Sequence, residues 1–567
     1  MKKFNAINLL IIMMLFSFSY GQEKEGNIVE YFGKEKVEDV LEGDIIHIFK
    51  EGLMYSRRNF PTEPKSVLSD PIFARIIAKS ESGITEGKSE GKDFKGEEVK
   101  WERIEVKENN EFNERRLGSG YLYLEYDSKV EQVVLFEASG HTTVLINGFP
   151  HEGDHYDFGW SLIPVKLKKG RNEFVLSGGR FSHMRARLLN TYKPVEFTSR
   201  DLTLPDLLIE EKSPLWGAIR VINMKDTWIK GGKILVEVGD ASRETKIADI
   251  LPMDVRKVPF SIPIPSNLEA LESVEAILYL KDGRNKIIDT TKIELGVKSK
   301  YKHHKNTFLS DIDKSVQYYS LVPSLTKNKE NQALFLSVHG ASVEAVNQAN
   351  AYKQKDWGHV VAPTNRRPFG FAWEDWGRLD AMEVLNHSEK LLETDPQQTY
   401  LTYYSMGGHG TWYLGATYPD RFAAIAPAAG YPDLLGYRQS RMSRMSEDQI
   451  QQYFEMTKAE FEERMSEDFS NAEEEQLDEI IKRAGNPSRT LKLENNYLHY
   501  GVYILHGDSD NVVPTYLAQE MRERLGQFHN DFAYYEYPGG EHWFGDESVD
   551  WPPIFYFFNL AKNKGRQ

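Results

Sequence analysis

The pattern of hydrophobic and polar positions predicts strands before residue 300 and alternating strands and helices after it. In the first part, short runs such as GYLYLEY, EQVVLFEA and NEFVLSGG alternate apolar and polar residues between Gly, Asn and Asp turns. This alternation is typical of antiparallel strands, and the Asn147-Gly148 step is typical of a hairpin turn. We therefore expect an all-β structure in the first part of the chain.

Two β units are predicted there. Residues 22–192 resemble the jelly-roll modules attached to polysaccharide-active enzymes, and this unit is a candidate for glycan binding. Residues 193–300 contain KILVEVG, VPFSIPIP and EAILYLKDG, whose alternation predicts an immunoglobulin-like sandwich. Neither unit shows a periodic repeat of propeller blades, and the polar segment YKHHKN that follows is typical of a linker.

A serine in the C-terminal half lies where an apolar strand meets glycines and an amphipathic helix. The segment YLTYYSMGGHG places Ser405 at that junction. A nucleophile elbow has this arrangement, because a sharp strand-to-helix turn exposes the serine hydroxyl and requires small neighbours. Gly407 and Gly408 provide the space, although Tyr403 stands where a glycine usually precedes the serine. Ser405 is therefore the candidate nucleophile.

Two later loops carry the partners that an acyl-transfer serine requires. The strand in VYILHGDSDNVVP is followed by Asp508 and Asp510, and the strand in YYEYPGGEHWF is followed by His542. The order Ser, Asp, His is that of an α/β-hydrolase, in which histidine takes the serine proton and the acid orients the histidine. The residues alone leave the acid open between Asp508 and Asp510.

Residues 301–567 alternate strands and helices around these loops. This predicts an α/β-hydrolase domain with a doubly wound, mostly parallel sheet, whose site lies at the carboxyl ends of the strands. Within it, residues 440–485 are predicted to form a helical insertion, because Ser446 and Gln449 make a capping box before apolar residues at helical spacing. The insertion is either a cap beside the site or a solvated excursion.

An acyl-transfer site also needs two backbone N–H groups to bind the developing oxyanion. Met406, directly after the nucleophile, is the candidate for the first. The apolar strand in LFLSVHGA ends in His-Gly, so the N–H of Ala341 or Gly340 is the candidate for the second. An ordinary tight turn at this His-Gly step is the alternative.

Residues 331–557 resemble the catalytic domain of prolyl-oligopeptidase-family (S9) serine hydrolases and, secondarily, feruloyl and acetyl esterases of the polyhydroxybutyrate-depolymerase type. The segments that carry the resemblance are HGA, APTNRRPFGFAWEDWGRLDAMEV, SMGGHGTWYLGATYPDRFAAIAPAAG, NPSRTL, HGDSDNVVP and DWPPIF, in that order. The resemblance implies a serine hydrolase that acts on a peptide or an ester. It also implies Asp510 as the acid, because the second aspartate of HGxxDxxVP meets the histidine in that fold.

Cationic and aromatic residues follow the predicted strand at 359–362 and are candidates for substrate binding. Arg366 and Arg367 carry guanidinium groups that either bind a substrate carboxylate or uronate bidentately or pair with nearby acidic residues. Trp373 and Trp376 either form the wall of an aromatic pocket or pack beneath it. The spacing of these residues does not choose between the alternatives.

Composition narrows the set of partners. The 567 residues carry a net charge of −15, which argues against nucleic acid or an anionic membrane surface as a partner. The absence of cysteine excludes disulfides, thiolate catalysis, a cysteine-bound metal and a lipoprotein anchor. No HExxH or similar histidine spacing is present, so we expect no metal and no cofactor.

The first residues, 1–21, are typical of a secretory signal peptide. Lys2 and Lys3 precede an apolar run at residues 7–18, and small residues follow it. The run is too short to span a membrane comfortably. We expect an exported protein, periplasmic or secreted, whose mature chain begins at Gln22.

Together these features predict an exported serine hydrolase that forms an acyl-enzyme at Ser405. Its expected substrate is a small molecule, a peptide or a polysaccharide-derived compound. The family resemblance favours a peptide bond, whereas the absence of propeller repeats favours an ester, as in a carbohydrate acetyl or feruloyl esterase. The competing class is a non-catalytic glycan-binding protein, which the joint presence of Ser405, Asp510 and His542 disfavours.

Overall fold

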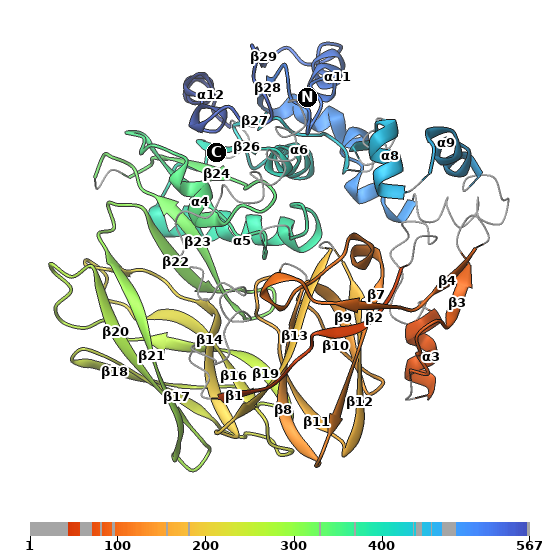
Figure 1. Cartoon of the computed structure of the whole chain (residues 1–567). Coiled ribbons are helices and arrows are strands. Elements are labelled where there is room, and N and C mark those ends of the chain that lie inside the picture. The colour runs from red at the N-terminus through yellow and green to blue at the C-terminus, as the bar shows by residue number, and fades with distance from the viewer. Residues whose placement is uncertain are drawn as a thin grey trace.

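The computed structural model describes residues 43–56, 71–79, 82–92, 97–154, 157–179, 182–327, 330–367, 370–434, 436–437, 445–454, 456–467 and 483–563. The predicted signal peptide and a large part of the predicted insertion lie outside these residues. The described chain forms two β-sandwiches of mainly antiparallel strands and a C-terminal sheet flanked by helices (Figure 1). No helix within the described ranges is both long and apolar enough to cross a membrane.

The first sandwich contains an antiparallel sheet of five strands and another of six. One sheet comprises β1 (Gly43–Ile48), β6 (Phe112–Asn113), β8 (Gln132–Ser139), β11 (Leu162–Leu167) and β13 (His183–Thr191). The other comprises β2 (Glu51–Tyr55), β5 (Glu102–Glu105), β7 (Tyr121–Ser128), β9 (His141–Ile146), β10 (Phe149–Glu152) and β12 (Gly170–Gly178). Their inward side chains share one core, in which the rings of Phe136 and Phe174 stack with centroids 4.9 Å apart.

Short elements surround this sandwich. They are α3 (Pro71–Lys79), β3 (Ser89–Lys92), β4 (Glu98–Lys100), η1 (Glu108–Asn110) and η2 (Arg115–Ser119). Apolar side chains of α3, including Phe73, pack with Trp101 and Tyr121 in a second cluster. Because a sheet has two faces, this cluster covers apolar residues that cannot point into the sandwich core.

The second sandwich again contains two sheets. One comprises β14 (Val195–Thr203), β16 (Leu215–Asn223) and β19 (Asp254–Ile262). The other comprises β15 (Leu207–Leu208), β17 (Lys233–Val238), β18 (Ala241–Lys246), β20 (Ser273–Lys281) and β21 (Ile287–Lys298). Every second side chain of β17 is buried, as the alternation of its sequence predicts. Leu135 and Leu189 of the first sandwich pack with Ile222 and Met224, so the two sandwiches share an apolar contact.

The C-terminal sheet has eight strands in the order β22-β23-β25-β24-β26-β27-β28-β29. The strands are β22 (His304–Leu309), β23 (Val316–Val322), β24 (Ala333–Ser337), β25 (Gly358–Ala362), β26 (Thr399–Tyr404), β27 (Ala424–Ala428), β28 (Gly501–Gly507) and β29 (Phe532–Tyr537). β22, β23 and β25 pair antiparallel, and the pairs from β25–β24 through β28–β29 are parallel. Parallel strands bury both faces, which explains why β24, β26, β27 and β28 are buried throughout.

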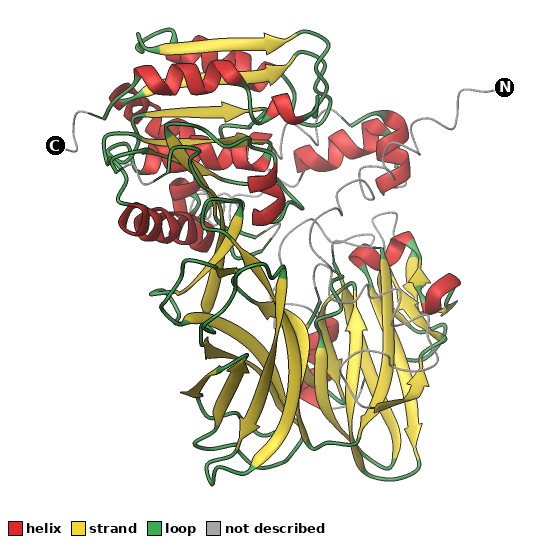
Figure 2. Ribbon diagram, turned by 90° about the vertical axis from the view of Figure 1, so that its left-hand side faces the viewer, coloured by secondary structure: helices red, strands yellow, loops and turns green. Residues whose placement is uncertain are grey.

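Helices lie on both sides of this sheet (Figure 2). They are α4 (Ala345–Asn350), α5 (Asp375–Leu392), α6 (Met406–Thr417), α11 (Tyr516–Leu525) and α12 (Pro552–Leu560), with the 3-10 turns η3 (Asn486–Ser488), η4 (Thr490–His499) and η5 (Asp546–Ser548). The described part of the insertion contains α8 (Glu447–Phe454) and α9 (Lys458–Glu467), which pack together through Ile450 and Phe461. Whether the insertion caps the site stays a prediction.

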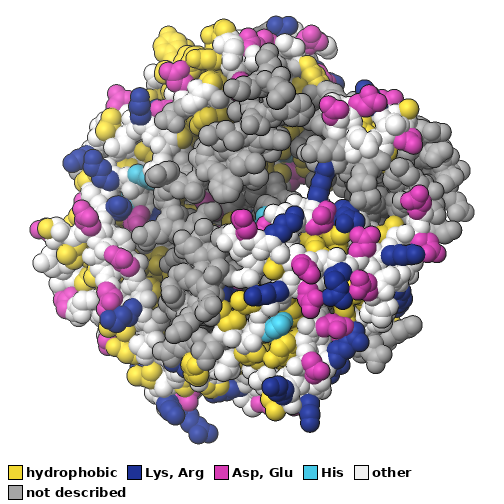
Figure 3. All heavy atoms as spheres, viewed as in Figure 1, with side chains coloured by type: hydrophobic (Ala, Val, Ile, Leu, Met, Phe, Trp, Pro, Cys, Tyr) yellow, Lys and Arg dark blue, Asp and Glu magenta, His cyan; other side chains and the backbone are white. Residues whose placement is uncertain are grey.

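The hairpin of β22 and β23 joins the C-terminal sheet to the second sandwich. The carboxylate of Asp206 accepts the backbone N–H of Lys305 at 2.7 Å, and the Thr307 hydroxyl donates to the carbonyl of Trp216 at 2.6 Å. The prediction that the segment YKHHKN is a linker is therefore wrong in part, because His304 is buried and begins β22. On the face shown in Figure 3, acidic and basic side chains lie interspersed over the sandwiches.

Gly408 marks the closest approach of α6 to the segment after β27. A Cβ at this position would lie 2.4 Å from the Ala428 carbonyl oxygen and 2.6 Å from Gly430 Cα. Because backbone atoms cannot rotate away, we expect Gly408→Ala to lower the free energy of unfolding by about 1–3 kcal/mol. Urea denaturation followed by circular dichroism measures the change.

The control is Gly436→Ala, whose Cβ would meet nothing closer than 3.7 Å among the described residues. We expect its free energy of unfolding to stay within about 0.5 kcal/mol of the wild-type value. Equal destabilisation by the two substitutions would show that the close approach at Gly408 is not the constraint.

Candidate active site

Ser405 occupies a strained turn between β26 and α6. Its φ is 60° and its ψ is −123°, a conformation that a residue with a side chain rarely adopts. The turn is held in place because the Ser405 N–H donates to the Ala428 carbonyl at 3.0 Å. A Cβ on Gly407 would lie 1.9 Å from the Val338 oxygen and 2.5 Å from the Tyr403 ring. The missing side chain of Gly407 thus makes room for the bulky Tyr403.

The serine hydroxyl, a histidine and an aspartate form a continuous hydrogen-bonded chain. Ser405 Oγ lies 2.9 Å from His542 Nε2, and His542 Nδ1 lies 2.7 Å from Asp510 Oδ2. Asp508 lies elsewhere: its Oδ1 accepts the Gly539 N–H at 2.8 Å. The structure therefore brings Asp510, and not Asp508, to His542. The arrangement matches the geometry in which a histidine removes a proton from a serine and an aspartate orients the histidine.

Asp510 is a buried carboxylate with several hydrogen-bond donors. Its Oδ1 accepts the N–H groups of Val512 and Val513, each at 2.9 Å, and His506 Nε2 lies 3.3 Å from Oδ2. Burial acts to raise the pKa of Asp510, but the hydrogen bonds from His506 and His542 outweigh it and hold the pKa below its usual range. The carboxylate therefore stays ionised and able to orient His542.

Sequence reasoning did not identify His506 and Tyr404 as parts of this site. His506 is buried, and its Nε2 also lies 2.8 Å from the Val513 carbonyl oxygen, so it connects β28 to the turn that carries Asp510. The Tyr404 hydroxyl donates to the carbonyl of His542, and its ring lies 5.4 Å from the His542 ring. The position of His506 four residues before Asp510 was the available signal for the first; no local pattern indicated the second.

The loop after β24 lies against the nucleophile. A Cβ on Gly340 would lie 3.7 Å from Ser405 Cβ, and Met406 is the first residue of α6. The Trp373 indole N–H donates to the His339 carbonyl at 2.9 Å and supports this loop. That Met406 and Ala341 supply oxyanion-binding N–H groups stays a prediction.

The structure separates the four substrate-binding candidates. Trp373 is fully buried beneath the loop after β24, which is the packing alternative of the two that its spacing left open. Arg366 is almost buried, and its Nε lies 3.2 Å from Asp380 Oδ1, so it acts in a structural ion pair instead of facing a substrate. Arg367 and Trp376 remain exposed to solvent.

A second pair missed by sequence reasoning ties α6 to the start of α5. His409 is buried one turn after Ser405, and its Nε2 lies 2.9 Å from Glu374 Oε1. Its Nδ1 lies 3.0 Å from the Tyr431 carbonyl oxygen. His409 thereby links the nucleophile helix to the loop that precedes α5.

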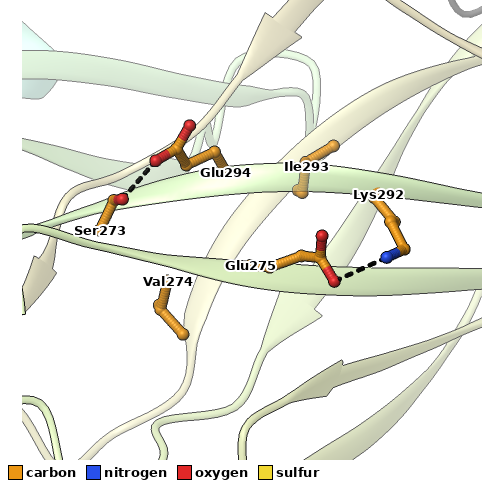
Figure 4. Close-up of a pocket in the computed structure, with 6 residues that line it drawn as sticks. All are labelled: Ser273, Val274, Glu275, Lys292, Ile293 and Glu294. Carbon is orange, nitrogen blue, oxygen red and sulfur yellow. Dashed lines mark hydrogen bonds and ion pairs between the residues drawn. The ribbon is translucent and has the colours of Figure 1, made fainter.

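A shallow hollow elsewhere on the surface lies over two strands of the second sandwich (Figure 4). In it, Ser273 pairs with Glu294 and Glu275 with Lys292, the latter at 3.0 Å. These are cross-strand pairs between β20 and β21, and none of them belongs to the Ser405 site. Among the described residues, no group of three or more His, Asp or Glu side chains is placed to hold a metal ion.

Comparison with known proteins found one curated relative and many distant structures. No family profile matches the chain. An uncharacterized secreted protein of Arthroderma benhamiae is 26% identical over an alignment of 269 residues, and the alignment covers 42% of this chain. The matched region spans about a quarter of the length of that relative.

The similar solved structures include three hydrolases. A thermostable esterase matches 65% of this chain over its whole length, at 14% identity and a TM-score of 0.33. A ferulic acid esterase of Anaeromyces mucronatus matches 47% of this chain over 92% of its own, at 14% identity and a TM-score of 0.30. A Bacteroides ovatus protein, provisionally assigned as a dipeptidyl aminopeptidase IV, matches 80% of this chain over 57% of its own, at 12% identity and a TM-score of 0.34. Likenesses this distant do not assign a substrate.

The contact between His542 and Asp510 generates a prediction about the two aspartates. Asp510→Asn should lower the kcat for p-nitrophenyl acetate by about 10⁴, because an amide stabilises the wrong tautomer of the histidine. Asp508→Asn is the matched control and should lower kcat much less, since Asp508 Oδ1 accepts the Ser509 hydroxyl and the Gly539 N–H, and no contact joins Asp508 to His542 among the described residues. The opposite ranking of the two variants would assign the acid to Asp508.

Proposed function

We propose that the protein is an exported serine hydrolase that cleaves an ester or an amide through a covalent acyl-enzyme. The observation that carries the proposal is the chain of short contacts from Ser405 Oγ through His542 to Asp510. Ser405, strained and placed at the end of a parallel strand, has the setting of a nucleophile elbow. The N-terminal segment with signal-peptide character and the secreted relative support export.

The proposed reaction proceeds in two halves. His542 removes the hydroxyl proton of Ser405 while Oγ attacks the substrate carbonyl, and the backbone N–H groups of Met406 and Ala341 bind the resulting oxyanion. His542 then donates its proton to the leaving alcohol or amine as the carbonyl–heteroatom bond breaks. A water molecule, deprotonated by His542, then attacks the acyl-enzyme. The bond between Ser405 Oγ and the acyl carbon breaks as His542 returns the proton to Oγ, which releases the acid and regenerates the serine. Asp510 remains ionised throughout and stabilises the imidazolium.

The same organisation supports a division of the chain into one catalytic domain and two β domains. We infer that residues 301–567 form the catalytic domain and that residues 22–192 and 193–300 form separate β domains. The strand boundaries are consistent with this, since β13 ends at Thr191 and β14 begins at Val195. A non-catalytic binding protein would have no need to keep the contacts between Ser405, His542 and Asp510.

The role of Ser405 is tested by covalent labelling. A fluorophosphonate probe should label the wild-type protein at Ser405, because the probe reacts with a serine activated by a histidine. Ser405→Ala should remove both the labelling and the hydrolysis of p-nitrophenyl acetate. Peptide mass spectrometry locates the label. Hydrolysis that persists in a folded Ser405→Ala protein would refute the proposal.

The oxyanion-binding role of Ala341 is tested by removing its N–H group. Ala341→Pro deletes the donor, and we expect a loss of about 10² to 10³ in kcat, with some added distortion of the backbone. The control is Ala341→Gly, which keeps the N–H and should retain most of the activity. Normal turnover by a folded Ala341→Pro protein would exclude this N–H as a donor.

A further inference from the structure

The loop between β25 and α5, described at residues 364–367 and 370–374, adopts an unusual backbone conformation. Four of its non-glycine residues have positive φ angles, and so does the first residue of α5: Asn365, Arg366, Ala372, Trp373 and Asp375. Such residues are strained unless the surroundings impose the conformation, and they cluster at functional sites. The conformation therefore suggests that this loop has a role beyond connecting two elements.

The loop between β25 and α5 forms two hydrogen bonds with His339, which lies in the loop after β24. The Thr364 carbonyl oxygen lies 2.9 Å from His339 Nε2, and the Trp373 indole N–H donates to the His339 carbonyl at 2.9 Å. His339 directly precedes Gly340, which lies against Ser405. The loop between β25 and α5 is thus held against the loop that carries the candidate oxyanion site through Thr364 and Trp373.

The loop and the first turn of α5 present aromatic rings to solvent. Phe371 and Trp376 are each 40% exposed, and their rings are nearly parallel, with centroids 6.4 Å apart. Phe371 and Trp376 thus expose two neighbouring aromatic rings on one part of the surface, where amphipathic and apolar ligands can pack. A planar or saturated ring can stack against such faces.

The first sandwich meets the loop at Arg367. The Arg367 guanidinium lies 5.2 Å from the centroid of the Trp160 ring, and Phe158 lies 4.5 Å from Trp160. The segment with these aromatic residues is held firmly, because the Asp154 carboxylate accepts the N–H groups of Phe158 and Gly159 at 3.1 and 2.6 Å. A residue from the first sandwich therefore borders the same surface as the loop between β25 and α5.

Positive charge is in excess at this junction. Arg367 is exposed, and no carboxylate lies within ion-pair distance of it among the described residues. The Arg220 guanidinium donates to the carbonyl of Trp160, whose ring lies 5.2 Å from the Arg367 guanidinium, so two cations flank Trp160. Arg220 has Glu152 at 3.7 Å as its partner, whereas a ligand anion would offset the charge of Arg367.

We propose that Arg367, Phe371 and Trp376, together with Trp160 of the first sandwich, form a substrate subsite that takes a ring bearing a carboxylate, either a uronic sugar or an aromatic acid. Arg367 binds the carboxylate, and the aromatic residues pack against the ring. The assignment as a substrate subsite rests on the proposed function of Ser405. Ligand binding itself does not require turnover, so it is tested separately.

The test is a ligand-observed NMR titration of the full-length Ser405→Ala protein with two matched pairs of probes. The first pair is methyl β-D-glucuronide and methyl β-D-glucoside, and the second is 3-phenylpropanoate and 3-phenylpropan-1-ol. In at least one pair, the carboxylate should bind about tenfold more tightly than its neutral partner. The pair that shows the preference identifies the ring as a sugar or as an aromatic group.

Two further substitutions in this protein localise the effect. Arg367→Gln should abolish the preference for the carboxylate, whereas Arg243→Gln, an exposed arginine on β18, should leave it unchanged. Trp160→Ala should weaken both members of the preferred pair, and Trp228→Ala, an exposed tryptophan of the second sandwich, should weaken neither.

Equal affinities within both pairs, or a preference that persists in Arg367→Gln, would overturn the subsite. Fluorophosphonate labelling of wild-type Ser405 is scored independently. If labelling succeeds and the titration fails, only the subsite is wrong; if labelling fails and the titration succeeds, the site binds the acid but its relation to catalysis is wrong.

Discussion

The close approach of α6 to the ends of β24 and β27 is the constraint on which the site depends. A side chain on Gly407 or Gly408 would collide with the backbone of these neighbouring segments. The absence of those side chains lets α6 begin directly after β26 and forces Ser405 into its strained conformation. The strain is maintained because the surrounding sheet leaves no room for the turn to relax. The serine hydroxyl is consequently presented at the edge where the parallel strands end.

The remaining partners reach Ser405 through hydrogen bonds that cross the same edge. Asp510 combines full burial with donors from Val512, Val513 and two histidines, which keeps a carboxylate charged in a place that would otherwise favour its neutral form. Tyr404, next to the nucleophile, binds the backbone of His542. The segment that carries the nucleophile therefore also contacts the backbone of the loop that carries the base.

Both β-sandwiches contact the C-terminal part of the chain. The hairpin of β22 and β23 bonds directly to the second sandwich, and the first sandwich meets the loop after β25 at Trp160 and Arg367. Because that loop also supports His339, the surface around the candidate site is built from segments that are distant in sequence. Ser405, His542 and Asp510 all lie in the last part of the chain, whereas the first sandwich contacts the loop after β25 through Trp160.

Local pattern in the amino-acid sequence determined three features: the β-rich first part, the strand–serine–helix turn at Ser405, and the loops that carry Asp510 and His542. These features follow from local pattern because hydrophobic periodicity and small residues control the backbone over only a few neighbouring positions. Only the tertiary structure decided which side chains meet. Ser405 and His542 are 137 positions apart, and their contact depends on sheet order and register, which periodicity does not encode. Local pattern also left two choices open: whether Trp373 lines a pocket or packs beneath it, and whether Arg366 faces a substrate or pairs with a nearby carboxylate. Tertiary packing decided for the burial of Trp373 and for the ion pair of Arg366 with Asp380, because each depends on neighbouring elements that local pattern does not place.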